Sequence, residues 1–468
     1  MPPLGRPREP GTVTLPPRTA TVAGDADVLV VGGGPAGLGA ALGAADAGGD
    51  VILVERHGFL GGNATAALVM PLMSFHTQRG PAPTGSASEL MPHDHGPGDP
   101  AVQGVLRRLL DRLEAAGGSL RPSPQTGFVV PFDPEVLKLV ALDLLDEAGV
   151  RVLLHAFATG VVGAPRPDGV VFETKSGPIV ITARAIVDAT GDGDVAALAG
   201  APFEIGRADD GLVQPMTLMF RVVEFERNHF AAYRGAHPDQ WRGVHGLWEL
   251  VREASAAGEL ALAREDILFF GTPHEHEVSV NSTRVTGALG TSVWDLTRAE
   301  WQARRQMRQI AAFLRKYVPG FERSYVAQSG VTIGVRETRR ITGECRLTAE
   351  DLLGARKWDD VIARGTYPLD IHNPQGKGTV LMRLPPGESY DIPLRCLLPQ
   401  RVDRLAVAGR CISGTHEAHS SYRVMPIAMA TGQAAGVCAA LAARAGKSVR
   451  DVPAGDVQAE LRRQGAAL

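Results

Sequence analysis

The stretch from residue 27 to residue 55, DVLVVGGGPAGLGAALGAADAGGDVILVE, constrains the fold more than any other part of the chain. A short β-branched run is followed by Gly32, Gly34 and Gly37 in G-x-G-x-x-G spacing, then by a helical pattern and a second apolar run that ends at Glu55. Such glycines permit a tight turn, let backbone approach a pyrophosphate and let the helix pack closely on the strand, while the acidic residue accepts hydrogen bonds from a ribose. The order predicts a Rossmann-like dinucleotide-binding unit, and it leaves FAD and NAD as alternatives.

Composition excludes several classes of protein. The chain has 468 residues, a net charge of -3 and four cysteines, none in C-x-x-C spacing. We therefore expect no nucleic-acid partner, no metal site and no redox-active dithiol. Residues 1–24 are rich in Pro and Arg and are predicted to be a disordered leader, not a signal peptide. Because no apolar run reaches membrane-spanning length, we expect no membrane span and a cytoplasmic protein.

Further αβ units follow the first one. Asp133, Pro134 and Glu135 have the pattern of a helix N-terminus, and a strand is predicted at residues 150–154. Two β-rich runs at residues 169–173 and 178–182 predict a hairpin meander. A β-branched strand then ends in A-T-G-D-G, which in combination with the opening motif indicates a second wall of a dinucleotide site.

The pattern of predicted helices and strands is different between residues 201 and 395. Strands are predicted at residues 216–223 and 277–281, and a capping box at residues 297–300 predicts the start of a long helix that Pro319 and Gly320 end. We interpret this part as an inserted α+β substrate domain. The predicted organisation is a leader (1–24), an FAD-binding domain in two parts (25–200 and 396–447), the substrate domain (201–395) and a C-terminal helix and tail (448–468).

The last informative block lies between residues 405 and 446. A buried strand reaches a glycine, a predicted loop carries His416, His419, Tyr422 and Arg423, and a helix rich in small residues begins near Met425. Its small residues would let that helix pack very close to a neighbour or to a cofactor.

Together these blocks resemble the FAD-dependent oxidoreductase family of the glutathione-reductase-type flavoprotein fold, with a single dinucleotide-binding domain. The resemblance covers residues 26–446, and we find no second G-x-G-x-x-G unit. It rests on the opening fingerprint and on six further runs: L-G-G-N-A-T (60–65), A-T-G-D-G-D (189–194), Q-P-M-T (214–217), G-V-R-E-T-R-R-I (334–341), Y-P-L-D-I-H-N-P (367–374) and A-G-R-C-I-S-G-T-H-E-A (408–418).

The resemblance implies a non-covalently bound FAD and a role for each matching segment. The glycine turn would hold the pyrophosphate, Glu55 the adenosine ribose, and Gly409 with Arg410 the ribityl–phosphate region. The helix after Arg423 would point its N-terminus at the pyrimidine edge of the flavin, where reduction places negative charge. The complete set of implied cofactor residues is Gly32, Gly34, Pro35, Ala36, Gly37, Glu55, Arg56, Gly62, Gly191, Asp192, Gly409, Arg410 and Arg423.

The predicted chemistry is hydride transfer between a small organic substrate and the flavin N5, as in a dehydrogenase or reductase. His416, His419 and His372 are the candidates for moving a proton, and Arg336 is a candidate for binding a carboxylate or an oxyanion. Two alternatives remain: a flavin oxidase or monooxygenase that uses O2, and a flavin-binding electron-transfer subunit of a redox complex. The sequence identifies neither the substrate, nor the electron acceptor or donor, nor the oligomeric state.

Overall fold

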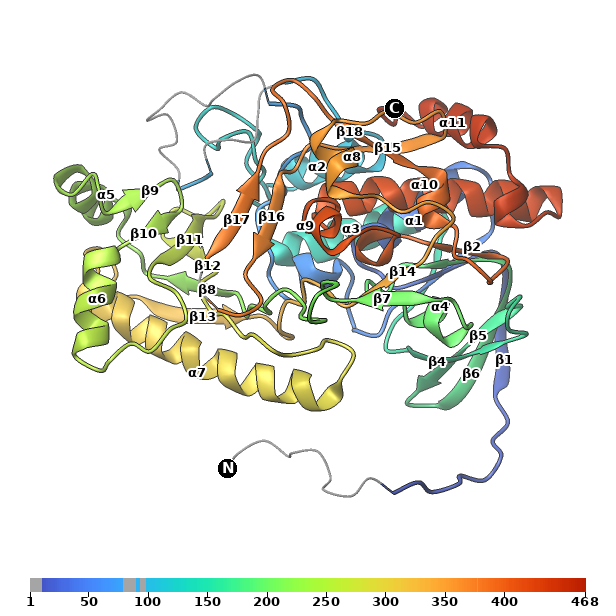
Figure 1. Ribbon diagram of the computed structural model, residues 1–468, viewed down its shortest axis with the longest axis horizontal. Helices are drawn as coiled ribbons and strands as arrows, with labels where there is room; N and C mark the ends of the chain where they lie inside the picture. Colours follow the sequence, from blue (N-terminus) through green and yellow to red (C-terminus); the bar gives the residue numbers. More distant parts are fainter. Residues whose placement is uncertain (1–10, 79–89, 93–97, 377) are drawn as a thin grey trace.

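A seven-stranded sheet forms the frame of the molecule in the computed structural model, which describes residues 11–78, 90–92, 98–376 and 378–468 (Figure 1). The strand order is β3-β2-β1-β6-β5-β4, and β19 also pairs with β6. Strands β3, β2, β1, β6 and β19 run parallel, whereas β5 and the first half of β6 form the predicted hairpin, which the unpredicted strand β4 extends in antiparallel pairing. The strands are β1 (Thr21–Val31), β2 (Val51–Val54), β3 (Arg151–Leu153), β4 (Phe157–Val162), β5 (Gly169–Thr174), β6 (Gly177–Asp188) and β19 (Leu405–Val407).

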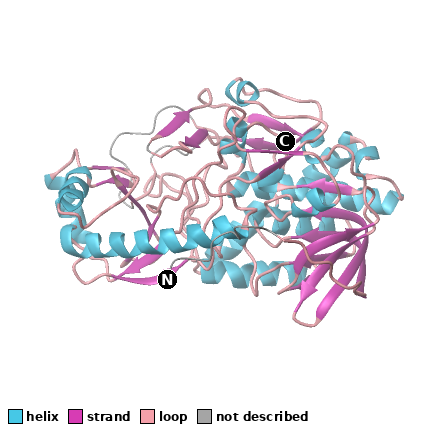
Figure 2. Cartoon of the chain, turned by 60° about the horizontal axis from the view of Figure 1, so that its bottom comes forward, coloured by secondary structure: helices cyan, strands magenta, loops and turns pink. Residues whose placement is uncertain are grey.

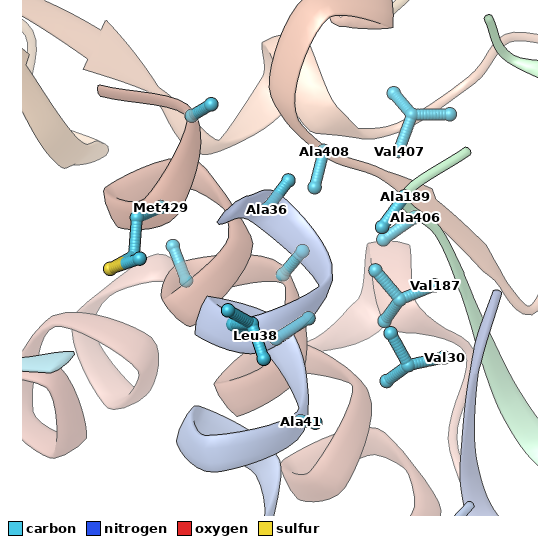
Figure 3. Close-up of a cluster of buried hydrophobic side chains, with 14 of the residues drawn as sticks. Val30, Ala36, Leu38, Ala41, Val187, Ala189, Ala406, Val407, Ala408 and Met429 are labelled. Carbon is cyan, nitrogen blue, oxygen red and sulfur yellow. The ribbon is translucent and has the colours of Figure 1, made fainter. Parts of the chain in front are cut away.

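Helices α1 (Pro35–Asp46) and α10 (Met425–Ala445) pack against each other with their backbones nearly in contact. A Cβ atom on Gly432 would lie 2.0 Å from the carbonyl oxygen of Ala36, and one on Gly39 would lie 2.2 Å from that of Met429. Figure 3 shows the apolar side chains around this crossing, with Ala36 and Leu38 of α1 beside Met429 of α10. The small residues of both helices therefore bring an early and a late segment of the chain together.

Other helices surround this half of the molecule. The predicted cap of α3 is confirmed, because the side chain of Asp133 accepts hydrogen bonds from the N–H groups of Glu135 and Val136. The helices are α2 (Val105–Ala115), α3 (Pro134–Glu147), α4 (Asp194–Leu198), α8 (Ala349–Leu353), α9 (His416–Tyr422) and α11 (Ala454–Arg463), with short 3-10 turns η2 (Leu394–Leu397) and η4 (Val449–Asp451).

A six-stranded sheet of order β13-β8-β12-β11-β10-β9 lies at the other end of the molecule, with the long helix α7 along it (Figures 1 and 2). Its separate core is rich in aromatic side chains, among them Phe225, Phe230, Trp241, Phe269 and Phe321. The elements are β8 (Phe220–Val223), β9 (Trp241–Arg242), β10 (His245–Gly246), β11 (Ile267–Gly271), β12 (Glu277–Val280), β13 (Tyr325–Ser329), α5 (Arg227–Ala236), α6 (Trp248–Ala256) and α7 (Val293–Tyr317).

Three two-stranded sheets complete the fold: β7 (Phe203–Ile205) with β14 (Arg339–Ile341), β15 (Val361–Gly365) with β18 (Tyr390–Pro393), and β16 (Leu369–His372) with β17 (Thr379–Met382). Buried residues between Ile341 and Leu394 belong to the same hydrophobic cluster as the first sheet. The expected α/β fold with an inserted α+β part is therefore present, and buried residues between 341 and 394 of the predicted substrate domain pack on the core of the first sheet.

Several local expectations were wrong. Strand β1 begins at Thr21, within the predicted leader; residues 11–20 form no helix or strand, and residues 1–10 lie outside the described part. Helix α7 starts one turn before the predicted capping box, because the side chain of Ser292 accepts the N–H of Asp295, while the Thr297 hydroxyl donates to the Val293 carbonyl inside the helix. The strand predicted at residues 216–223 is regular only over β8.

Helix α10 also corrects the expectation that no apolar run reaches membrane-spanning length. Its 21 residues are long enough and apolar enough to cross a membrane, and 89% of its most apolar 18-residue window is buried inside the protein. Such burial is typical of a core helix, and α10 packs on α1 in that manner.

Candidate functional site

The glycine turn between β1 and α1 leaves no room for side chains. Gly32 has a φ of +104°, which places it in the region that glycine adopts readily. A Cβ atom on Gly37 would lie 1.7 Å from the carbonyl oxygen of Gly32. The first turn of α1, which begins at Pro35 after Gly34, is thereby held against the end of β1.

A second pair of glycines lies against this turn. The N–H of Gly61 donates to the carbonyl of Gly33 at 2.8 Å, and a Cβ atom on Gly62 would lie 2.7 Å from the Cα of Gly34. Gly62 begins the 3-10 turn η1 (Gly62–Ala64). The L-G-G-N-A-T run therefore lies beside the opening fingerprint.

Glu55 is buried at the end of β2, with its carboxylate directed at the glycine turn. Its Oε2 accepts the N–H of Gly33 at 2.7 Å, and its Oε1 accepts the N–H of His57 at 2.8 Å. Arg56, the next residue, is exposed. The ribose-binding role of Glu55 stays a prediction, and its position beside the turn is consistent with that role.

The turn after β6 is linked to the closing part of the chain by an ion pair. Asp192 Oδ1 accepts from Arg410 Nη2 at 2.9 Å and from the Thr338 hydroxyl at 2.7 Å. Gly191 has a φ of +81°, and a Cβ atom there would lie 2.8 Å from Arg410 Nη2. A side chain at residue 191 would therefore displace the arginine.

Gly409 brings the closing segment against the first helix. A Cβ atom on Gly409 would lie 2.8 Å from the Cβ of Ala36, and its N–H donates to the hydroxyl of Thr431 in α10 at 3.1 Å. It begins the 3-10 turn η3 (Gly409–Cys411) that holds Arg410. The implied cofactor residues of the opening, middle and closing motifs thus lie in one place.

A cavity of about 630 Å³ lies between the start of α10 and the six-stranded sheet. Asn63, Arg410, Arg423 and Met425 line it from the first half of the molecule, and Met219, Trp248 and Phe270 are among the residues that line it from the second. A volume of this size is typical of small-molecule sites.

Asp370, at the start of β16, is the centre of a charged cluster in the cavity wall. Its Oδ2 accepts from the Tyr367 hydroxyl at 3.0 Å and lies 3.2 Å from His372 Nε2 and 3.4 Å from Arg423 Nη2. Burial alone would raise the pKa of Asp370, but His372, Arg423 and Arg336 hold it well below its ordinary value.

His372 is held between Asp370 and Arg284. Its Nδ1 lies 3.0 Å from Arg284 Nη2, and because a guanidinium only donates, Nδ1 accepts and the ring proton is on Nε2, facing Asp370. Burial lowers the pKa of His372 to about 4, despite the opposing effect of Asp370. The imidazole is therefore neutral at physiological pH.

Arg336 also lines the cavity, near Arg423 and Asp370. Its Nη1 donates to the carbonyl of Pro215 at 2.6 Å and to the hydroxyl of Thr217 at 2.5 Å. Burial, together with the nearby charge of Arg423, lowers the pKa of Arg336 to about 9.

His416 and His419 are not among the residues that line the cavity. The predicted loop is helix α9, capped by the side chain of Thr415, and it turns both histidines into the core. His416 Nδ1 lies 2.9 Å from Glu337, and burial holds the pKa of His419 well below its ordinary value. The structure thus brings His372 and Arg336 together and leaves the other two predicted catalytic residues elsewhere.

Two features of the site were missed in the sequence. Nothing in the Y-P-L-D-I-H-N-P run distinguishes Asp370 as the centre of a cluster, and Arg284 lies in no motif at all. Among the described residues, no group of three or more His, Cys, Asp or Glu side chains is placed to hold a metal ion.

The chain matches the family model described as FAD dependent oxidoreductase over residues 27–461. It belongs to that family. The protein is therefore an enzyme, an oxidoreductase whose cofactor is FAD. No curated protein matches the chain.

Several solved structures are similar to this FAD-dependent oxidoreductase at low identity. One is a geranylgeranyl bacteriochlorophyll reductase-like protein from Thermoplasma acidophilum (12% identity, TM-score 0.42, 94% of this chain and 82% of that one). Another is p-nitrophenol 4-monooxygenase PnpA from Pseudomonas putida DLL-E4 (11%, 0.46, 94% and 84%). A third is the myxobacterial chondrochloren halogenase CndH (14%, 0.45, 94% and 79%). At these values the similarity carries no argument about the reaction.

The residues present fit FAD. At Gly32, Gly37 and Gly62 a Cβ atom would clash with neighbouring backbone, so these turns present bare backbone, as a pyrophosphate site requires. Within the described chain, Arg410 Nη1 and Arg423 Nε are buried nitrogens that have no hydrogen-bond partner, and both residues line the cavity. Because buried donors are normally paired, both atoms are available to acceptors of a bound cofactor or substrate.

Proposed function

We propose that this enzyme transfers a hydride between a small organic substrate, bound in the cavity, and the N5 atom of FAD. One observation carries the proposal: the cavity joins the start of α10 and Arg410, from the cofactor half, to apolar and charged side chains of the six-stranded half. FAD, when bound, supplies the acceptor or donor of the hydride. We further propose non-covalent binding, the glutathione-reductase-type arrangement of this fold and a cytoplasmic location.

The start of α10 supplies positive potential to the cavity. The helix has 21 residues and begins at Met425 with Pro426 in its first turn, and Arg423 lies two residues before its start. Unpaired N–H groups at a helix N-terminus attract negative charge, and a guanidinium adds to the effect. This pairing is suited to holding negative charge on a cofactor or substrate at that end of the cavity.

His372 is the proposed proton-handling residue. Its Nε2–H donates to Asp370, which fixes the tautomer, and its Nδ1 is the atom that can accept a proton once Arg284 Nη2 no longer donates to it. A substrate group that draws Arg284 away would therefore create the base.

The experiment that tests the proposal begins with the absorption spectrum of the purified protein and identification of the chromophore released by acid. Candidate substrates are then tested for bleaching of the flavin without oxygen and for peroxide or oxygenated product in air. Anaerobic bleaching without rapid reaction in air supports the dehydrogenase or reductase proposal. An oxygenated product or fast peroxide formation replaces it with the monooxygenase or oxidase alternative. A protein that takes up no FAD contradicts it.

A further inference from the structure

The charges around the cavity do not balance. Three acidic side chains line it, whereas five arginines do: Arg264, Arg284, Arg336, Arg410 and Arg423. Since a buried charge is stable only when paired or strongly hydrogen-bonded, the partner of each arginine matters.

Three of these arginines have carboxylate partners. Arg264 lies 3.0 Å from Asp266, and Arg423 lies 3.4 Å from Asp370. Arg410 lies 2.9 Å from Asp192. Their charges are compensated within the protein.

Arg284 and Arg336 have no ion-pair partner among the residues that the structure describes. Arg284 donates to the carbonyl of Gly376 at 2.6 Å and to His372, and Arg336 donates to a carbonyl and a hydroxyl. All of these acceptors are neutral. Burial and neighbouring arginines lower the pKa of both side chains, and the nearby carboxylate of Asp370 opposes this shift without removing it.

The other residues that line the cavity indicate the chemistry of the rest of the ligand, beyond the anionic group that would pair with Arg284 and Arg336. Met219, Val244, Trp248, Leu268 and Phe270 supply an apolar surface. Asn281 also lines the cavity, and its Oδ1 is a buried atom for which no partner is found in the described chain. An apolar body with one hydrogen-bond donor would satisfy both features.

We infer that the substrate of this enzyme is an apolar carboxylic acid whose carboxylate binds to Arg284 and Arg336. A guanidinium matches a carboxylate in shape and charge, and such pairs are stronger than neutral hydrogen bonds. A phosphate dianion fits less well, because Asp370 and Asp266 face the same cavity. The inference rests on the proposed function, since it names the substrate class of that same site.

The test measures binding to the FAD-loaded enzyme by calorimetry and by the change in flavin absorption. The probes are acetate, benzoate, phenylacetate and 1-naphthoate, each with its neutral amide, and phenyl phosphate. We expect at least one carboxylate to bind about tenfold or more tightly than its amide, since a charged hydrogen bond contributes more than a neutral one. Equal binding of every acid and amide, no binding of any acid, or preference for phenyl phosphate overturns the inference.

Variants assign the carboxylate to the two arginines. We expect Arg284→Gln and Arg336→Gln to weaken carboxylate binding about tenfold or more and to leave amide binding little changed. Arg284→Lys keeps the positive charge but lacks the planar guanidinium that can donate two hydrogen bonds to one carboxylate, so it should retain part of the affinity. Arg308→Gln removes the same charge at an exposed position of α7 and should have no effect. Unchanged carboxylate binding in both glutamine variants overturns the inference.

FAD content and melting temperature are recorded for each variant, so that a loss of folding is recognised. A variant that fails to fold is replaced by its lysine counterpart, and the ratio of acid to amide affinity decides the outcome. A protein without FAD would contradict the proposed function, whereas calorimetry on the same protein would still measure carboxylate binding.

Discussion

The environment of His372 contributes to the response of the enzyme to acid. The pKa of this imidazole falls from 6.5 to about 4 on folding, because burial disfavours the charged ring. Between these two pH values the unfolded chain binds a proton that the folded chain does not, so stability falls as the pH is lowered through this range. Above pH 6.5 the group has no such effect.

We expect His372→Gln to flatten this acid dependence. The melting temperature of the FAD-saturated wild type should fall between pH 6.5 and pH 4 more steeply than that of the variant. Thermal unfolding at a series of pH values measures the difference. His229→Gln, at an exposed position of α5, is the matched control. Identical slopes for wild type and His372→Gln would show that His372 is not held neutral.

Glu55 is expected to govern cofactor affinity. Its Oε2 accepts the N–H of Gly33, so Glu55→Gln brings an amide group, which can place a donor against that N–H, into the glycine turn. We expect FAD to bind more weakly by about 1–3 kcal/mol. Quenching of FAD fluorescence measures the affinity, and Glu173→Gln, at a partly exposed position of β5, serves as the control. An unchanged affinity would remove Glu55 from the cofactor site.

Residues whose roles depend on backbone space were predictable from the sequence, whereas residues whose roles depend on distant partners were not. The spacing of Gly32 and Gly37 follows from a turn that allows no Cβ atom, and this constraint is local. Asp370 acquires its role from Arg423, which is 53 residues away, and Arg284 from His372, which is 88 residues away. Single-sequence patterns contain no information about such pairs.

At the scale of elements, the crossing of α1 and α10 depends on glycine. Alanine is normally the better helix former, by about 1 kcal/mol. At Gly432, however, a Cβ atom would lie 2.0 Å from a backbone oxygen of α1, and at Gly436 the distance to the oxygen of Ala40 is also 2.0 Å. Backbone atoms cannot move aside as a flexible side chain can, so the helices must separate.

We therefore expect Gly432→Ala and Gly436→Ala to destabilise the protein by about 2 kcal/mol or more and to reduce FAD content. Gly455→Ala is the matched control, since Gly455 lies in helix α11 and a Cβ atom there meets nothing within 4 Å. It should leave stability unchanged or raise it slightly. Chemical denaturation measures all three variants, and a neutral effect of Gly432→Ala would contradict the packing described for this crossing.

Element types were easier to predict than element ends. The start of α7 had two competing signals, and the structure uses Ser292, whereas Thr297 bonds within the helix. Either Ser292 or Thr297 could cap a helix as far as the local sequence is concerned, and only the packing of the first turn determines which of them does so. Helix α9 was missed because seven residues are too few for helical periodicity to be recognised.

The whole molecule has two cores with the cavity between them. One cluster contains the first sheet with α1 and α10, and another contains the aromatic residues of the second sheet. Buried residues between 341 and 394, which the sequence pattern assigns to the substrate domain, pack on the first core. Which core a strand joins is decided by tertiary contacts.

Removal of FAD is expected to destabilise the whole molecule. The implied cofactor residues come from the opening, middle and closing parts of the chain, so FAD should stabilise the fold by linking them. A ligand present at 100 times its dissociation constant contributes about 2.7 kcal/mol. We expect the melting temperature to fall when FAD is removed and to rise with FAD concentration when it is restored.

Tryptophan fluorescence shows whether this stabilisation reaches the second core. Four of the five tryptophans, Trp241, Trp248, Trp294 and Trp301, lie in the second part of the molecule, and Trp248 lines the cavity. Because the cavity joins the two parts, we expect FAD to raise the transition seen by tryptophan fluorescence as much as the transition seen by circular dichroism. If the temperature of the tryptophan transition does not change with FAD, the second core unfolds independently of the first. The cavity then does not couple the stability of the two parts.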